Sequence, residues 1–165
     1  MTLSGKGIGD PMASKTTLNA KNLEALGVGR LAELLIEIST GSAAAKRKLR
    51  LELASAQSPR EAARQIIKRL TSIAGARSFI NWKTRKALVM DLETQRKAIV
   101  EQIAATDSEE ALALLWRFMG LATPVFERCD DSSGAVIGVF HQACRDLGEV
   151  ALTARAISQN LSWPR

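Results

Sequence analysis

Three side chains in the C-terminal part of the sequence are of the types that bind zinc or carry out nucleophilic chemistry. They are Cys129, His141 and Cys144, and the last two are three residues apart, on one face of a predicted helix. A structural zinc site needs four such ligands in a tetrahedron, and the sequence has no CxxC pair. A catalytic Cys–His pair would need an activated thiolate and an oxyanion hole, which nothing in the sequence indicates. We therefore expect packing and surface roles, and predict no metal, cofactor or catalytic residue.

A short polar segment follows Cys129 and has the composition of a cation or phosphoryl site, Asp130-Asp131-Ser132-Ser133-Gly134. The same residue types end one helix and begin the next, because Gly adopts left-handed backbone angles and Asp and Ser cap helices. The sequence contains no P-loop, GxGxxG or HExxH motif. We interpret the segment as a structural loop.

Positive charge is concentrated in the middle of the chain. Residues 57–103 contain ten Lys/Arg and four Asp/Glu, whereas residues 104–165 contain five Lys/Arg and eight Asp/Glu. Arg60, Arg64 and Lys68 form a basic stripe at four-residue spacing. Lys83, Arg85 and Lys86 form a basic group at the start of the next predicted helix. Such a surface neutralises phosphates in nucleic-acid-binding proteins, but it is also typical of a solvated helix face. No base-reading or aromatic-stacking module is recognisable.

The elements that position these residues are predicted to be helices. Apolar residues recur at helical spacing after Leu18, tyrosine is absent, and alternating β-branched runs are missing. We expect an all-α fold of about seven helices, arranged as an antiparallel bundle or as stacked αα-hairpins. One expected helix follows Asn19 and another follows Ser42. The other five cover about residues 29–40, 58–75, 81–103, 107–129 and 135–158. Pro124 is expected to kink the helix over residues 107–129.

The best-marked helix start is Ser58-Pro59-Arg60-Glu61. A Ser N-cap, Pro at the first helical position and Glu at the third form a capping box. The helix that begins there should turn Ile66, Leu70 and Ile73 toward the core.

Two tryptophans lie within the predicted helices, Trp82 at a helix entry beside cations and Trp116 in the middle of a helix. An exposed ring beside cations is suited to stacking on a base, but such a tryptophan more often anchors the incoming loop. We expect both rings to be largely buried, so that removing either would cost about 3–5 kcal/mol of stability.

Composition also predicts the organisation and compartment of the chain. We expect residues 1–17 to be disordered, residues 18–158 to form a single all-α domain, and residues 159–165 to be a frayed tail. Two cysteines favour a reducing compartment, and no apolar run is long enough for a membrane span or a signal peptide. These features predict a cytoplasmic protein that does not interact with membranes.

Several segments resemble the N-terminal part of a bacterial family catalogued as domain of unknown function 6880. The resemblance extends over about residues 12–155 and rests on Leu18-Asn19-Ala20-Lys21-Asn22-Leu23, Arg77-Ser78-Phe79-Ile80-Asn81-Trp82-Lys83, Asp91-Leu92-Glu93-Thr94-Gln95-Arg96 and Pro124-Val125-Phe126-Glu127-Arg128-Cys129-Asp130-Asp131-Ser132-Ser133-Gly134. It implies that the chain is the front portion of a longer helical protein. It implies no activity.

The sequence favours an interaction role over an enzymatic one. The surplus of apolar residues from Leu112 to Ala154 predicts a non-enzymatic helical interaction or scaffold domain that binds a protein partner or forms a homo-oligomer. The alternative is nucleic-acid binding through residues 57–103. An enzyme with an unrecognised site is the least favoured interpretation.

Overall fold

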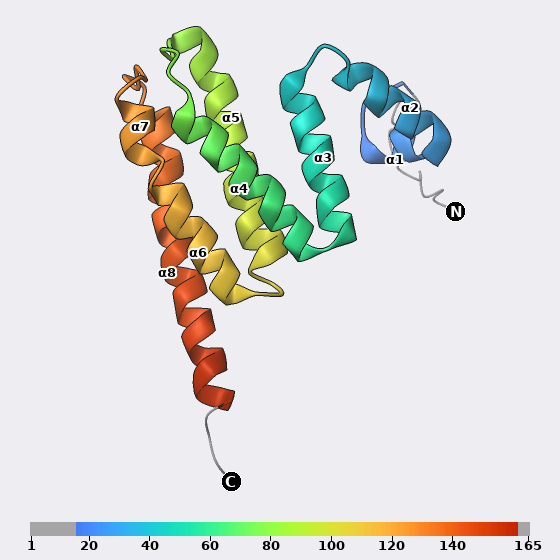
Figure 1. Ribbon diagram of the computed structural model, residues 1–165. Helices are drawn as coiled ribbons and strands as arrows, with labels where there is room; N and C mark the ends of the chain where they lie inside the picture. Colours follow the sequence, from blue (N-terminus) through green and yellow to red (C-terminus); the bar gives the residue numbers. More distant parts are fainter. Residues whose placement is uncertain (1–15, 162–165) are drawn as a thin grey trace, which may run out of the picture. The chain divides into compact units, whose positions relative to one another are not determined.

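The computed structural model describes residues 16–161, with side chains through residue 156. Within this range the chain forms helices joined by turns, without a strand, so the predicted all-α class is confirmed (Figure 1). The helices are α1 (Ala20–Glu24), α2 (Val28–Ser39), α3 (Ala43–Gln57), α4 (Pro59–Gly75), α5 (Trp82–Ala98), the π-helical segment η1 (Ile99–Ile103), α6 (Ser108–Met119), α7 (Ala122–Phe126) and α8 (Ala135–Leu161).

The chain divides into two compact units, one that runs through Ala43 and one that begins at Ala44. This boundary lies inside residues 18–158, for which the sequence led us to expect one domain. Most of the segment predicted to be disordered, residues 1–15, and the last four residues of the predicted tail lie outside the described residues. Helix α8 continues to Leu161 and so includes the first residues of that tail.

The first unit contains α1 and α2. Asn19 caps α1, because its Oδ1 accepts the backbone N–H of Asn22 at 2.8 Å. Gly27 joins the two helices with φ of +80°, a conformation that residues with a Cβ rarely adopt. Ile36 and Ile38 of α2 are exposed. This unit therefore leaves apolar surface on α2 uncovered.

Helix α4, in the second unit, begins where the sequence predicted, with half of the expected capping box. The Ser58 Oγ accepts the N–H of Glu61 at 3.2 Å, and Pro59 occupies the first helical position. The Ser58 N–H donates to the carbonyl of Ala54 at 3.0 Å, so Glu61 has no free N–H to bind there. Its carboxylate instead accepts a hydrogen bond from Arg64 at 2.6 Å.

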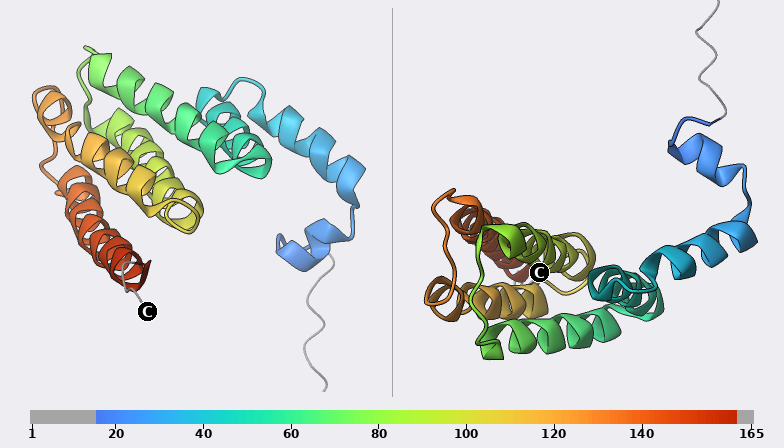
Figure 2. Two further views of the ribbon diagram at one scale, coloured as in Figure 1. Left: turned by 60° about the horizontal axis from the view of Figure 1, so that its bottom comes forward. Right: turned by 90° about the horizontal axis from the view of Figure 1, so that it is seen from above.

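The second unit packs its helices around a shared apolar core. Successive long helices from α3 to α8 run in opposite directions, α6 lies along α8, and α4 contacts α6 and η1 (Figure 1, Figure 2). Ile66, Leu70 and Ile73 of α4 are buried, as predicted. The Phe140 ring lies 5.5 Å, centroid to centroid, from both Phe118 and Phe126. This packing determines which faces of α4 and α5 are exposed to solvent.

A buried polar cluster joins α5 to α8. Arg96 donates through Nη1 to the Asp146 carboxylate and through Nη2 to Glu93 at 2.8 Å. Gln142 donates to the other Asp146 oxygen at 2.9 Å. Burial lowers the pKa of Arg96, but its hydrogen bonds and charge interactions with Glu93 and Asp146 outweigh burial and raise it. The arginine is therefore charged inside the unit, and its two carboxylates compensate that charge.

The helix predicted over residues 107–129 is two helices, and the predicted kink at Pro124 was wrong. Helix α6 ends at Met119, and α7 begins at Ala122, so the break precedes the proline. Pro124 lies in the first turn of α7, where backbone N–H groups have no partner within the helix. A proline at that position disrupts no hydrogen bond and needs no kink.

Candidate functional site

Four cations surround a hollow of about 200 Å³ between α3, α4 and α5. We call Arg47, Arg50, Lys68 and Arg69, with the space between them, the basic hollow. Its complete lining is Arg47, Arg50, Leu51, Gln65, Lys68, Arg69, Ser72 and Gln95. Seven of the eight lining residues carry polar side chains, and Leu51 is the apolar one.

Helical spacing explains why these residues share one surface. On α4, the lining residues Gln65, Lys68, Arg69 and Ser72 recur at intervals of three and four, so they share one face. The buried Ile66 and the residues in register with it lie on another face of α4. Packing that face inward therefore turns the basic residues outward.

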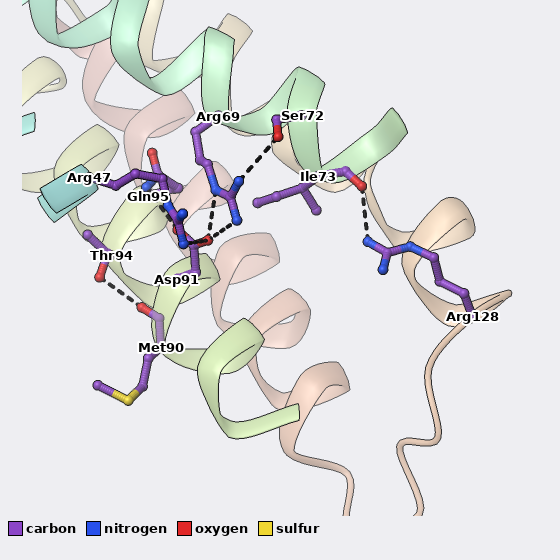
Figure 3. A network of polar contacts seen from close by, with 9 residues as sticks. All are labelled: Arg47, Arg69, Ser72, Ile73, Met90, Asp91, Thr94, Gln95 and Arg128. Carbon is purple, nitrogen blue, oxygen red and sulfur yellow. Dashed lines mark hydrogen bonds and ion pairs between the residues drawn. The ribbon is translucent and has the colours of Figure 1, made fainter. Parts of the chain in front are cut away.

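The carboxylate of Asp91, on α5, organises the two arginines of the hollow (Figure 3). Its Oδ2 accepts from Nε of Arg69 at 2.7 Å and also from Nη2 of that residue, while Nη2 of Arg47 lies 3.5 Å away. The remaining oxygen, Oδ1, accepts from Gln95 at 3.4 Å. The Asp91 side chain is 9% exposed, so this carboxylate is a nearly buried anchor for cations from two other helices.

Donors remain available in the basic hollow after these contacts. Three of the five N–H groups of Arg69 are engaged, because its Nη1 also donates to Ser72 at 3.2 Å. Arg47 keeps a buried Nε with no hydrogen-bond partner among the described residues. Arg50 and Lys68 are exposed, and in the described part of the chain neither forms an ion pair. Four cations thus line one hollow, and one carboxylate, Asp91, pairs with two of them, an arrangement that favours an anion with several acceptor oxygens.

The structure places the basic residues of the predicted stripe on α4 in two different hollows. Lys68 lies in the basic hollow, whereas Arg60 and Arg64 line a different hollow that also contains Asp107 and Glu110. These acidic neighbours reduce the positive potential around Arg60 and Arg64.

The predicted basic residues at the start of α5 have three different environments. The Lys83 Nζ lies 5.3 Å from the centre of the Trp82 ring, a cation–π distance. Arg85 donates to the backbone carbonyl of Asp130 at 2.6 Å. Lys86 is exposed.

The prediction that Trp82 and Trp116 are buried was wrong, because their exposed fractions are 67% and 72%. Ile80 anchors the loop before α5 instead, and it is 7% exposed. Its N–H donates to the carbonyl of Arg128 at 2.7 Å, and its carbonyl accepts from Asp130 at 3.1 Å. Since Ile80 takes the inward position, Trp82 is left at the surface.

The Cys129, His141 and Cys144 set does not form a metal centre in the described part of the chain, where no three His, Cys, Asp or Glu side chains are placed to hold an ion. His141 and Cys144 are exposed on α8, and Cys129 is half-buried beside Ile80. Burial, and then the charge of Asp131, raise the pKa of the Cys129 thiol. A raised pKa disfavours the nucleophilic thiolate.

The loop Asp130–Gly134 makes the contacts of a helix start. The Asp131 carboxylate accepts the N–H groups of Val136 at 2.9 Å and Ile137 at 2.8 Å, at the beginning of α8. Ser133 accepts from Ala135 at 3.3 Å. Gly134 has φ of +69°. These contacts support the structural interpretation of the loop.

Sequence reasoning missed the contribution of α3 to the basic hollow. The basic run Lys46-Arg47-Lys48-Arg50 was visible, but it lies outside residues 57–103. The three-residue spacing of Arg47 and Arg50 was a signal that both occupy one helix face. Asp91 offered no comparable signal, because its partners are 22 and 44 residues away.

Comparison with known proteins identifies one family. A family of unknown function (DUF6880) matches residues 13–162. No curated protein and no solved structure matches the chain. None of the described helices has both the length and the apolar character needed to cross a membrane.

Proposed function

The chain belongs to the DUF6880 family, whose function is unknown, and we propose that it binds nucleic acid through the basic hollow. The observation that carries this proposal is the gathering of Arg47, Arg50, Lys68 and Arg69 around one hollow, in which a single carboxylate, Asp91, pairs with two of them. Phosphate oxygens accept hydrogen bonds from several cations at once, and each phosphate neutralised releases counterions. A backbone of regularly spaced phosphates is therefore the ligand class that this surface fits best.

Two features favour a polymer over a small anion. The hollow is open, and a further exposed cation, Lys46, lies one turn before Arg50 on the same face of α3. The Asp91 carboxylate holds Arg69 in place before any ligand arrives, so part of the surface is preorganised. An extended basic face on rigid helices positions a backbone without reading its sequence.

Charge reversal tests this proposal. We expect Arg50→Glu with Lys68→Glu to weaken binding of a dye-labelled oligonucleotide at least about tenfold at low salt, with a salt slope about two smaller in magnitude. Fluorescence anisotropy measured over a salt series gives both quantities. Both side chains are exposed, and circular dichroism checks that the variant remains folded.

The matched control is Arg145→Glu with Arg155→Glu, which changes net charge equally on exposed positions of α8. We expect its affinity to stay within about twofold to threefold of the unmodified chain, since long-range charge effects are screened at moderate salt. Equal losses in the two double variants would show that net charge, and not the hollow, attracts the nucleic acid. Absence of binding by the unmodified chain at low salt would remove the proposal.

Self-association is a second candidate, favoured by the exposed apolar side chains of α2. Most of the apolar surface that suggested it from sequence, between Leu112 and Ala154, is buried where α6 packs on α8. We propose instead that Leu35 and Ile38, which are exposed and three residues apart on one face of α2, contact a second copy of this chain.

Replacing Leu35 and Ile38 with aspartate is expected to convert a dimer to a monomer in size-exclusion chromatography with light scattering, because buried charges destabilise an apolar interface. The control is Leu53→Asp, at an apolar and exposed position on α3. An unmodified chain that is monomeric at high concentration would contradict this candidate.

A further inference from the structure

Two exposed aromatic side chains, Phe79 and Trp82, lie just before the basic residues at the start of α5. They are 66% and 67% exposed, and no acidic residue occurs between Arg77 and Met90. Large exposed rings are costly in water and often mark binding surfaces. Aromatic faces interleaved with cations are the combination that recognises unpaired bases along a charged backbone.

Hydrogen bonds to the segment around Cys129 fix the backbone of the loop that carries these rings. Ile80 forms a backbone bridge with Cys129, and the Arg128 guanidinium donates to the carbonyls of Ser78 at 3.1 Å and Ile73 at 3.0 Å. Between the two rings in sequence, the Asn81 side chain accepts the N–H groups of Lys83 and Thr84 in the first turn of α5. The backbone on both sides of Phe79 is therefore fixed, so the loop backbone loses little conformational freedom when a ligand binds.

The loop follows the last turn of α4, which contains Ser72 of the basic hollow (Figure 3). Ile73, whose carbonyl binds Arg128, follows Ser72, which binds Arg69 of the hollow. Arg77, Lys83 and Lys86 are exposed around the rings. The acidic residues of the facing segment are Glu127, Asp130 and Asp131, and Asp131 is already engaged by the N–H groups of α8.

We propose that Phe79 and Trp82 form a stacking platform for the bases of a single strand whose phosphates contact the neighbouring cations Arg77, Lys83 and Lys86, an inference that rests on the proposed function. A duplex keeps its base faces stacked on one another, so exposed rings gain little from it. Single-stranded nucleic acid offers both free base faces and phosphates. The platform therefore confers preference for single strands, and the hollow confers affinity for any strand.

Anisotropy with two probes tests the platform. We expect Phe79→Ala with Trp82→Ala to weaken binding of oligothymidylate at least about tenfold, and binding of a duplex of equal length less than about threefold. Trp116→Ala, at an equally exposed tryptophan on α6, is the control and should leave both affinities unchanged. Equal weakening of both probes, or none, would overturn the platform.

Intrinsic fluorescence provides a direct readout of stacking. In a chain with Trp116→Phe and Trp163→Phe, Trp82 is the remaining tryptophan, and we expect oligothymidylate to quench it strongly. Quenching by a polyglutamate peptide to the same extent would instead identify the platform as a surface for an acidic protein partner. Quenching by neither probe would also overturn the inference.

The two proposals fail in different ways. Loss of oligothymidylate and duplex binding in the Arg50→Glu, Lys68→Glu variant, with unchanged single-strand preference in the aromatic variant, supports the hollow and overturns the platform. Selective loss in the aromatic variant, with no effect of charge reversal, supports the platform and overturns the hollow.

Discussion

Replacing Asp146 with alanine is expected to destabilise the second unit by about 3–5 kcal/mol, because it removes a partner of a buried charge. The side chains of Arg96 and Asp146 are 10% and 5% exposed, so water cannot replace the lost carboxylate fully. Glu93 remains as a partner of Arg96, so we expect the loss of stability to stay within this range and not to exceed it. Urea unfolding followed by circular dichroism measures the change in the free energy of unfolding.

The control for Asp146→Ala is Glu61→Ala, which breaks an ion pair at the surface. Arg64 is 61% exposed in that pair, and we expect a loss below about 1 kcal/mol. A similar loss in both variants would contradict the idea that burial makes the Arg96 cluster costly to break.

The second large effect is expected from Phe118→Ala, which should destabilise the same unit by about 3–5 kcal/mol. The Phe118 side chain is fully buried on α6 and contacts the Phe140 ring on α8. Alanine there leaves a cavity that the close-packed helices cannot fill completely. The same urea experiment gives the magnitude.

The control for Phe118→Ala is the same substitution at Phe79, a phenylalanine that is exposed. Phe79→Ala removes the same atoms from a position that is largely exposed, and we expect a change within about 0.5 kcal/mol. If Phe79→Ala destabilised the protein as much as Phe118→Ala, the loop before α5 would be a folding anchor and its ring would not be available to a ligand.

Local signals placed the helix that carries part of the basic hollow. Ser58 and Pro59 identified the start of α4, since a side-chain acceptor and a missing N–H both suit the first turn. The spacing of Ile66, Leu70 and Ile73 identified its buried face, because residues three and four apart share one side of a helix. Both signals depend on neighbours within a few residues.

The candidate site could not be predicted in the same way. Arg47, Arg69 and Asp91 come together only because α3, α4 and α5 pack beside one another. The exposure of Trp82 likewise depends on Ile80, which meets a segment nearly fifty residues away. Single-residue preferences favoured burial of the tryptophan, and a backbone bridge between distant segments determined otherwise.

The amino-acid sequence by itself determined the helical class of this protein, the start of α4, the inward stripe of α4 and the excess of positive charge over residues 57–103. These properties follow from backbone hydrogen bonding and side-chain periodicity, which act over one or two helical turns. Only the tertiary structure decided which cations share a hollow, which carboxylate holds them, and which aromatic rings remain in water. Those outcomes depend on the packing of helices distant in sequence, since contact between such segments is set by the whole core and not by local spacing.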